Sequence, residues 1–321
     1  MEYNIKNIAT IVDGKMLQLS QDAMIEHLLI DSRKVYSSST SLFFALKGSR
    51  RDGHQFISEL YKRGVPNFII SEAVKVSDYP QANFILVADT LEALQRLAGF
   101  HRKQFSIPVI GITGSNGKTI VKEWLYQLLH ENFNIVRSPK SYNSQIGVPL
   151  SIWQMNSHHE LAIFEAGISK PGEMEKLEKI IQPTIGILTN IGEAHSENFP
   201  NREEKLKEKL KLFAHANKVI SKGDDAWITR QMMRLEINNF LWGRNMTSDL
   251  QVTSIGRRDF QTEIILSYKH ETFQFAIPFI DEGSIENAIT CCSLLLVAGI
   301  DRSFIQEKMQ HLQPVSMVPD F

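Results

Sequence analysis

The sequence predicts an α/β protein with two domains. A small mixed α/β domain comes first, followed by a larger domain with a mostly parallel sheet and a small antiparallel β section. The chain has 321 residues, which suggests two domains, and its hydrophobic content of 43% is enough for sizeable cores. Short apolar runs alternate with turns and helical patterns along most of the chain. Between residues 250 and 277 the pattern changes to that of antiparallel strands joined by tight turns.

The composition excludes several classes of function. A net charge of −1 predicts no nucleic-acid footprint and no basic patch for a membrane surface. The N-terminus lacks the apolar core of a signal peptide, and no apolar stretch approaches the ~18 residues of a membrane span. The two cysteines, Cys291 and Cys292, are adjacent in an apolar run, which predicts buried, reduced thiols. We therefore expect a soluble, cytoplasmic protein.

The first domain is predicted over residues 1–88. Its apolar runs predict four strands, at residues 28–30, 42–46, 68–70 and 84–87. A helix is predicted at residues 53–63, between the second and third of these strands. A further amphipathic helix, at residues 89–105 with Asp89 or Thr90 as its cap, leads into the second domain, which is predicted over residues 89–317.

The second domain opens with a strand, a glycine turn and a helix. The strand is the apolar run 109–112, and the turn is Thr113-Gly114-Ser115-Asn116-Gly117, followed by Lys118-Thr119. Glycines let backbone N–H groups converge on an anion, and a helix N-terminus adds about half a positive charge. Lys118 would reach the β- and γ-phosphates of a nucleotide, and the Thr119 hydroxyl would bind Mg²⁺. A plain glycine turn is the alternative, but such a turn does not need Lys-Thr at this place. The segment therefore predicts a P-loop domain that binds a nucleoside triphosphate, although Ile112 stands where the general pattern GxxxxGK[ST] has its first glycine.

Two later predicted strands are each followed by, or end in, a residue type that can bind a metal ion. The strand at residues 161–165 ends in Glu165, and the strand at residues 185–190 is followed by His195. Parallel sheets place their ligands beyond the carboxyl ends of the strands, so Glu165 is well placed for a metal ion. A lone histidine at a strand end is more often a structural residue, and that alternative applies to His195.

The remaining elements follow from periodicity and turn residues. Residues 202–213 are highly charged, and the simplest interpretation is an amphipathic helix with Leu206, Leu210 and Phe213 inward and its charges solvated. A loop is predicted at 137–149, strands at 219–221 and 240–242, helices at 225–234 and 283–297, and antiparallel strands at 250–255, 262–268 and 272–277.

The short loop Thr-Gly-Ser-Asn-Gly-Lys-Thr, with Lys122-Glu123 after it, resembles that of the Mur ligases of peptidoglycan synthesis. The resemblance is greatest to the branch that adds D-alanyl-D-alanine to UDP-MurNAc-tripeptide. Further matching runs are Asp31-Ser32-Arg33, Asp52-Gly53-His54, Ala166 to Met174, the Asn-Ile-Gly-x-Ala-His run at 190–195 and the Leu-x-Pro-Val-x-Met run at 312–317. Asn287-Ala288 matches the last two residues of the family's His-Asn-x-x-Asn-Ala motif, whose first pair is absent here.

The resemblance implies a set of site residues. Ser32 and Arg33 would bind the uridine diphosphate end of the substrate, and Asn143 would also contact the substrate. ATP would be bound by Gly114, Ser115, Asn116, Gly117, Lys118, Thr119 and Asn287. One Mg²⁺ would be held by Thr119 and Glu165, and a second by His195 and Lys209, the latter as a carbamate. Lys118, Lys209 and His195 would be the catalytic residues.

The implied activity is ATP-dependent amide ligation through an acyl phosphate, in the cytoplasmic steps of cell-wall synthesis on which cell shape and division depend. The family's third domain would follow Met317, so we expect this chain to lack that C-terminal ligase domain and to be inactive alone. Cooperation with such a domain, or fusion to a further protein such as an alanine racemase, is left open. The alternatives are another ligase of the superfamily such as a folylpolyglutamate synthase, an ordinary P-loop kinase or NTPase, and a non-catalytic nucleotide-binding module.

Overall fold

The computed structural model describes the chain apart from residues 1–2, 36, 49–50, 193–197, 235–236 and 317–321. The chain forms two compact units. Unit 1 consists of Met1–Phe105 and Ile152–Ser157, and unit 2 of Ser106–Ser151 and His158–Phe321. None of the helices that the structure describes combines the length and the apolar character that crossing a bilayer requires.

Unit 1 is a small mixed α/β unit, as the sequence predicts. Its main sheet has the strand order β2-β7-β6-β5-β4, parallel except for the antiparallel pair β2–β7. The aromatic side chains of Phe43, Phe68 and Phe84 fill its core, and Phe68 stacks on Phe84 with ring centroids 5.1 Å apart. The strands are β1 (Tyr3–Asn4), β2 (Lys15–Gln18), β3 (Met24–Ile25), β4 (His27–Leu29), β5 (Ser41–Phe44), β6 (Asn67–Ile70) and β7 (Asn83–Leu86). The helices are α1 (Ile5–Ile11), α2 (Ile57–Lys62) and α3 (Thr90–Arg102), with short 3₁₀ turns η1 (Gly53–Phe56) and η2 (Val76–Asp78).

The helix α3 belongs to unit 1, so this unit extends beyond the predicted boundary at residue 88. The Asp89 carboxylate caps the helix by accepting from the N–H groups of Leu91 and Glu92, at 2.7 and 2.9 Å. The buried side of α3 packs against α1 and β5. An amphipathic helix at a domain boundary carries no sequence signal for which neighbour its apolar face will cover, and here that neighbour is unit 1.

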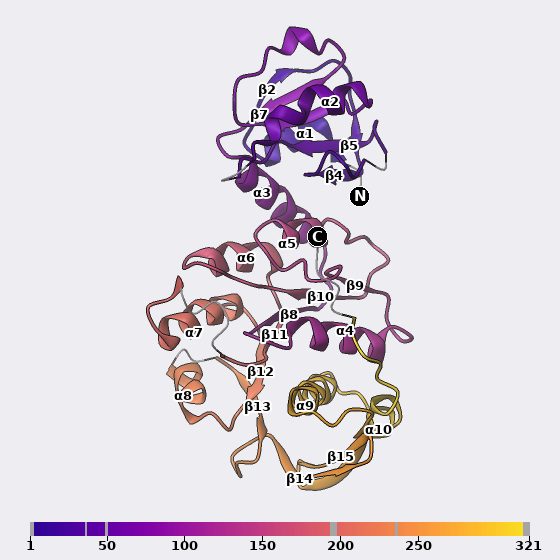
Figure 1. Cartoon of the computed structure of the whole chain (residues 1–321), viewed down its shortest axis with the longest axis vertical. Coiled ribbons are helices and arrows are strands. Elements are labelled where there is room, and N and C mark those ends of the chain that lie inside the picture. Colours follow the sequence, from indigo (N-terminus) through magenta and orange to yellow (C-terminus); the bar gives the residue numbers. More distant parts are fainter. Residues whose placement is uncertain (1–2, 36, 49–50, 193–197, 235–236, 317–321) are drawn as a thin grey trace. The chain divides into compact units, whose positions relative to one another are not determined.

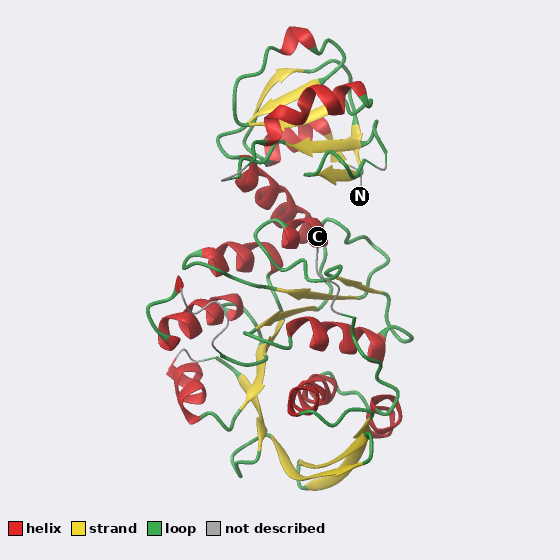
Figure 2. Ribbon diagram, viewed as in Figure 1, coloured by secondary structure: helices red, strands yellow, loops and turns green. Residues whose placement is uncertain are grey.

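Unit 2 is built on one nine-stranded sheet with the order β16-β15-β14-β13-β12-β11-β8-β10-β9. The neighbours from β9 to β14 pair in parallel, and β14, β15 and β16 pair antiparallel. The predicted fold class is therefore confirmed, with the antiparallel section continuing the parallel sheet (Figure 2). The strands are β8 (Val109–Thr113), β9 (Ile135–Arg137), β10 (Leu161–Glu165), β11 (Ile185–Leu188), β12 (Lys218–Lys222), β13 (Asn239–Gly243), β14 (Leu250–Arg258), β15 (Gln261–Tyr268) and β16 (Glu271–Ile277).

Helices cover both faces of this sheet. Figure 1 shows α6, α7 and α8 on one face and α4, α9 and α10 on the other. Two glycines in the central strands allow close packing on the first face. A Cβ at Gly111 would lie 2.7 Å from the Pro183 side chain, and one at Gly186 would clash with the Phe213 ring. The helices are α4 (Lys118–Leu129), α5 (Gly147–Ile152), α6 (Glu173–Ile181), α7 (Arg202–Leu210), α8 (Ala226–Arg234), α9 (Glu282–Val297) and α10 (Arg302–Met309), and α7 continues into the 3₁₀ turn η4 (Lys211–Phe213).

Candidate active site

The predicted phosphate loop joins β8 to α4, and two glycines determine its path. Gly114 has a φ of +148° and Gly117 a φ of +82°, which are conformations that favour glycine. Space is also limiting, because a Cβ at Gly114 would clash with the Thr189 hydroxyl and one at Gly117 with the Asn287 side chain. The contact between Gly117 and Asn287 places the predicted ATP-binding residue of α9 directly beside the loop.

Residues that follow β11 hold the loop. The Ser115 N–H donates to the Asn190 carbonyl (2.9 Å), and the Asn116 N–H donates to the Asn190 side-chain oxygen (3.0 Å). The Gly192 N–H donates to the Ser115 hydroxyl (2.9 Å), and the Thr189 hydroxyl donates to the Asn116 carbonyl (2.6 Å). Two loop N–H groups therefore bond to protein oxygens in this structure. Sequence reasoning missed the role of Asn190, whose only signal was its place at the start of the Asn-Ile-Gly-x-Ala-His run.

Three lysine side chains converge on this loop and on Gly192. The Lys118 ammonium donates to the carbonyls of Gly114 (3.1 Å) and Ser115 (3.3 Å). Lys209 donates to the same Gly114 carbonyl (3.0 Å), and Lys205 donates to the Gly192 carbonyl (2.6 Å). Lys205 and Lys209 are buried. Burial, and then the charges of Lys118 and Lys205, lower the pKa of Lys209 to about 7. Burial likewise lowers the pKa of Lys118, although Glu165 acts in the opposite direction.

The expectation that the other charges of residues 202–213 are solvated is wrong for Lys205. Lys205 and Lys209 are four residues apart, so they lie on the same side of α7, and this side faces the loop. The expectation holds for Lys207, which is exposed and pairs with Glu203 and Glu204 at 3.0 Å. Glu208 is buried as well, and its carboxylate accepts from the Gly172 N–H at 2.7 Å, just before α6.

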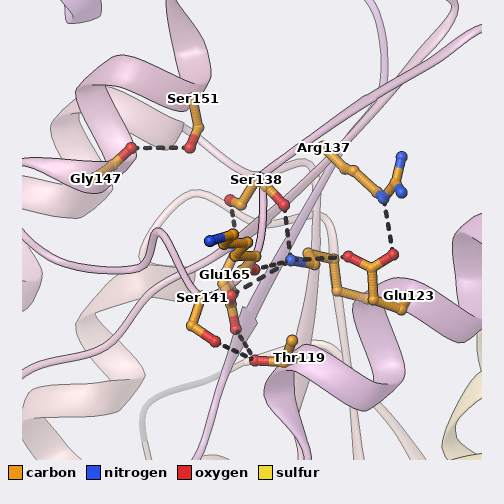
Figure 3. Close-up of polar contacts among 10 residues, drawn as sticks. Thr119, Glu123, Arg137, Ser138, Ser141, Gly147, Ser151 and Glu165 are labelled. Atoms are coloured by element: carbon orange, nitrogen blue, oxygen red, sulfur yellow. Dashed lines mark hydrogen bonds and ion pairs between the residues drawn. The ribbon is translucent and has the colours of Figure 1, made fainter. Parts of the chain in front are cut away.

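A carboxylate and a hydroxyl meet where β10 ends beside the start of α4. The Thr119 hydroxyl donates to Glu165 Oε2 at 2.9 Å, and the Ser141 hydroxyl lies 3.3 Å from the Thr119 hydroxyl (Figure 3). Glu165 is fully buried, and burial raises the pKa of its carboxyl, while the nearby Lys122 is the largest influence that lowers it. Hard oxygen ligands of these two kinds suit Mg²⁺. The donor set of Thr119 and Glu165 therefore fits the predicted magnesium ion.

Lys122 is a further charged residue of this site that sequence reasoning did not assign. Its side chain is fully buried on α4, one turn after Thr119. Its ammonium contacts Glu165 and two backbone carbonyls of the segment after β9. The only signal in the sequence was the Lys122-Glu123 pair that follows the loop motif.

The other predicted residues of unit 2 are placed as follows. The Asn143 carbonyl accepts from the Gly167 N–H (2.8 Å), which holds Asn143 beside the segment that follows Glu165. Asn287 is buried beside Gly117. His195 lies outside the described residues, so of the predicted ligands of a second metal ion the structure describes Lys209.

The predicted substrate residues Ser32 and Arg33 lie in unit 1. The guanidinium of Arg33 forms a two-point contact with Asp31, with Nε 2.9 Å from Oδ1 and a terminal nitrogen 2.7 Å from Oδ2. The Arg33 side chain is 76% exposed, whereas Ser32 is buried. The hydrogen bond from Arg33 lowers the pKa of Asp31 to about 2. The fork that would recognise a diphosphate is therefore oriented by Asp31 at the surface.

A cleft of about 670 Å³ lies beyond the ends of β11 and β12. Asn190 lines it and also bonds to the phosphate loop, so the cleft begins where the loop is held. Its lining is mixed in character: Leu188, Thr189, Asn190, Ile191, Arg202, Ser221, Lys222, Asp224, Asp225, Ala226, Trp227, Ile228 and Glu286.

The fold and this site define an α/β protein of the phosphate-loop class. The sequence model of the Mur ligase middle domain matches residues 112–295, and that described as "Mur ligase family, catalytic domain" matches residues 24–102. The chain belongs to the Mur ligase family.

The relatives narrow the comparison to one branch of the family. The UDP-N-acetylmuramoyl-tripeptide–D-alanyl-D-alanine ligase of Borreliella burgdorferi is 32% identical over 322 residues, which cover 95% of this chain and 65% of the relative. The enzyme of the same name from Bacillus subtilis is 29% identical over 300 residues, covering 92% of this chain and 64% of the relative. The crystal structure of the MurF ligase of Thermotoga maritima in complex with ADP superposes with a TM-score of 0.80 at 27% identity, covering 90% of this chain and 66% of that chain. This chain thus spans slightly less than two thirds of the length of the two curated relatives.

Proposed function

We propose that this chain acts in the ATP-dependent addition of D-alanyl-D-alanine to UDP-MurNAc-tripeptide, a cytoplasmic step of peptidoglycan synthesis. The observation that carries the proposal is the meeting of Lys118, Thr119 and Glu165 at the start of α4. The names of the relatives, and the matches that extend over both units, support the choice of substrates.

ATP would bind with its phosphates at the loop Gly114–Gly117 and the N-terminus of α4. Lys118 would turn from the loop carbonyls to the β- and γ-phosphates and neutralise part of their charge. Asn287, beside Gly117, and the cleft that begins at Asn190 would take the nucleoside. The Thermotoga maritima relative was solved in complex with ADP, which supports the binding of an adenine nucleotide.

Thr119 and Glu165 would hold a Mg²⁺ ion, and His195 together with a carbamate on Lys209 would hold a second. Bound magnesium would compensate charge on the phosphoryl oxygens. Two features of Lys209 favour the carbamate, which forms from a neutral amine and CO₂. Its pKa of about 7 leaves a large neutral fraction at neutral pH, and the neighbouring cations Lys118 and Lys205 favour an anionic product.

The residues of the chain would mainly position the reactants. The peptide carboxylate would attack the γ-phosphorus of ATP and release ADP, and the amine of D-alanyl-D-alanine would then displace inorganic phosphate from the acyl phosphate and lose a proton. Lys118 and the loop would orient the transferred group, and Asn143 would contact the peptide substrate. In unit 1, Ser32 and Arg33 would bind the uridine diphosphate.

A binding panel tests the proposal. Titration calorimetry of the chain with UDP-MurNAc-tripeptide, with Mg·ATP and with folate is expected to show binding of the first two compounds only. Binding of folate would favour a folylpolyglutamate synthase, for which the match to residues 24–102 offers no support. Binding of Mg·ATP alone would favour a plain nucleotide-binding module.

A further inference from the structure

The buried ammonium of Lys122 lies beside the residues proposed to hold magnesium. Lys122 is on α4, and its side chain has an exposed fraction of 0%. Removing an ammonium ion from water is costly unless hydrogen bonds and opposite charges replace the lost hydration. The contacts that replace it here therefore indicate what the residue holds in place.

These contacts join three segments of unit 2. The Lys122 ammonium donates to the Ser138 carbonyl at 2.7 Å and to the Lys140 carbonyl, both in the segment after β9. It also lies 3.1 Å from Glu123 Oε1 on α4 and 3.5 Å from Glu165 Oε1 at the end of β10. A single side chain thus connects the helix of the phosphate loop, the segment that leads to Asn143, and the carboxylate of Glu165.

The two oxygens of Glu165 are contacted from two successive turns of α4. Thr119 donates to Oε2 at 2.9 Å, and Lys122 approaches Oε1 at 3.5 Å. The Glu165 N–H donates to the Ser138 hydroxyl at 3.4 Å (Figure 3). The Ser138 carbonyl accepts from Lys122, so Ser138 connects to both residues. The orientation of the carboxylate is therefore determined before any cation binds.

Glu123 keeps the charge of Lys122 compensated. The Lys122 ammonium is closer to Glu123 (3.1 Å) than to Glu165 (3.5 Å), and Arg137 Nε contacts the other Glu123 oxygen at 3.0 Å (Figure 3). Arg137 is itself held over the Tyr126 ring, 3.5 Å from the ring centroid. Because Glu123 is the nearer partner, Lys122 stays paired when the Glu165 oxygens bind a metal ion.

We propose that Lys122 is a positioning residue of the magnesium–nucleotide site. It holds Glu165 and the Ser138–Lys140 segment in place against Thr119, so that the oxygen ligands are assembled before magnesium arrives. This inference rests on the proposed function for the presence of Mg·ATP, and it adds a role for Lys122. Groups that orient metal ligands typically contribute about 10–100-fold to metal affinity.

The test measures the magnesium requirement of ATP binding by the 321-residue chain. ATP is titrated by calorimetry at a series of Mg²⁺ concentrations and in EDTA, with the wild type, Lys122→Met, Lys122→Arg and Lys207→Met. For Lys122→Met, the Mg²⁺ concentration that gives half of the magnesium-dependent gain in ATP affinity should rise about tenfold or more, because Glu165 loses its orientation. ATP affinity in EDTA should stay close to wild type, because Lys118 and the loop are unchanged. Lys122→Arg keeps the positive charge, so its magnesium requirement should lie between those of the wild type and Lys122→Met.

Lys207→Met is the matched control, because it removes the same charge from an exposed lysine of α7, and it should leave both affinities unchanged. Thermal unfolding without ligand reports the stability of each variant. A Lys122→Met chain with lowered stability and a wild-type magnesium requirement would overturn the proposal and leave Lys122 a structural residue only.

Glu123→Gln provides a second test if Lys122→Met does not fold. Among the described residues, Glu165 is then the remaining carboxylate partner of Lys122, so magnesium must compete with a stronger Lys122–Glu165 ion pair. The Mg²⁺ concentration required for ATP binding should therefore rise. An unchanged requirement in this variant would also overturn the proposal. A wild-type chain that binds no ATP under any condition would instead count against the proposed function.

Discussion

A lysine ammonium in water is strongly hydrated, and Lys205 and Lys209 have replaced that water with carbonyl oxygens of the phosphate loop and its neighbour Gly192. Carbonyl oxygens carry only partial charge, so they compensate the burial of an ammonium incompletely. The pKa of Lys209 falls for this reason, and the amine becomes available for chemistry that an exposed lysine does not show at neutral pH.

We expect Lys118→Ala to weaken Mg·ATP binding roughly tenfold or more, because a charge-assisted contact of this kind is worth about 1.5–3 kcal/mol. The fold should survive, because the Lys118 side chain is only half-buried and donates to carbonyls of its own loop, not to the core. Calorimetry compares this variant with Lys207→Ala, whose affinity should match the wild type. An affinity in Lys118→Ala equal to that of the control would remove the phosphate-loop assignment.

We expect Lys209 to carry a carbamate in bicarbonate buffer. With ¹³C-labelled bicarbonate, the wild type should give a carbamate carbon resonance that Lys209→Ala lacks. The amine must be neutral to react, so the resonance should grow as the pH rises from about 6 to about 8, through the pKa of about 7. Identical spectra for wild type and Lys209→Ala across this range would show that Lys209 remains an ordinary ammonium.

Among the elements, the turn between β8 and α4 depends most on its glycines. Gly114→Ala should lower the free energy of unfolding by about 1–3 kcal/mol and abolish ATP binding, because a Cβ there clashes with the Thr189 hydroxyl. Gly172→Ala is the matched control. Gly172 also has a positive φ (+83°), but a Cβ at this position would meet none of the described residues within 4 Å, so the substitution tests backbone strain alone. Equal destabilisation of the two variants in urea unfolding would mean that the clash with Thr189 is unimportant.

The sequence was sufficient for most elements, because their signals are local. The predicted antiparallel strands correspond to β14, β15 and β16, and the helix predicted at 283–297 is α9. The meeting of Thr119 with Glu165 also follows from local signals, since parallel strands bring their carboxyl ends to one edge.

What the sequence could not predict depends on packing between distant segments. Lys205 is buried because it lies on the side of α7 that faces the loop. The distance between the α7 layer and the sheet is set by Phe213, which packs over Gly186. Asn190 bonds to a loop that is distant in the sequence, and its partner Asn116 lies 74 residues earlier in the chain. The partners of Lys122 likewise come from segments that only the folded sheet brings together.

At the scale of the whole molecule, unit 1 includes a short segment from the middle of the chain, Ile152–Ser157. His101 is buried between this segment and the N-terminus: its Nε2–H donates to the Met155 carbonyl (3.0 Å), and its Nδ1 accepts from the Tyr3 hydroxyl (2.8 Å). Trp153 packs against the same imidazole, with ring centroids 4.8 Å apart. This arrangement suits the neutral imidazole.

The stability of unit 1 should therefore fall in mild acid. Burial lowers the pKa of His101 from 6.5 to about 4, so the unfolded chain binds a proton between these values and the folded chain does not. The stabilisation is present above pH 6.5 and is lost as the pH falls towards 4, with a loss of about 2 kcal/mol by pH 5. Urea unfolding at pH 7 and pH 5 should show a smaller loss in His101→Gln, and parallel losses in the two proteins would contradict this account.

The segment Ile152–Ser157 also bears on how this architecture can be inherited. The chain passes between the units after Phe105, after Ser151 and after Ser157, so unit 1 is encoded by two separate stretches of the gene. A recombination event at the first boundary would transfer Met1–Phe105 without Trp153 and Met155, and the recipient would receive Tyr3 and His101 without their packing partners. Exchange of unit 1 between relatives thus requires two matched crossovers or a recipient whose own segment complements the new core, which favours descent of the two units as one gene.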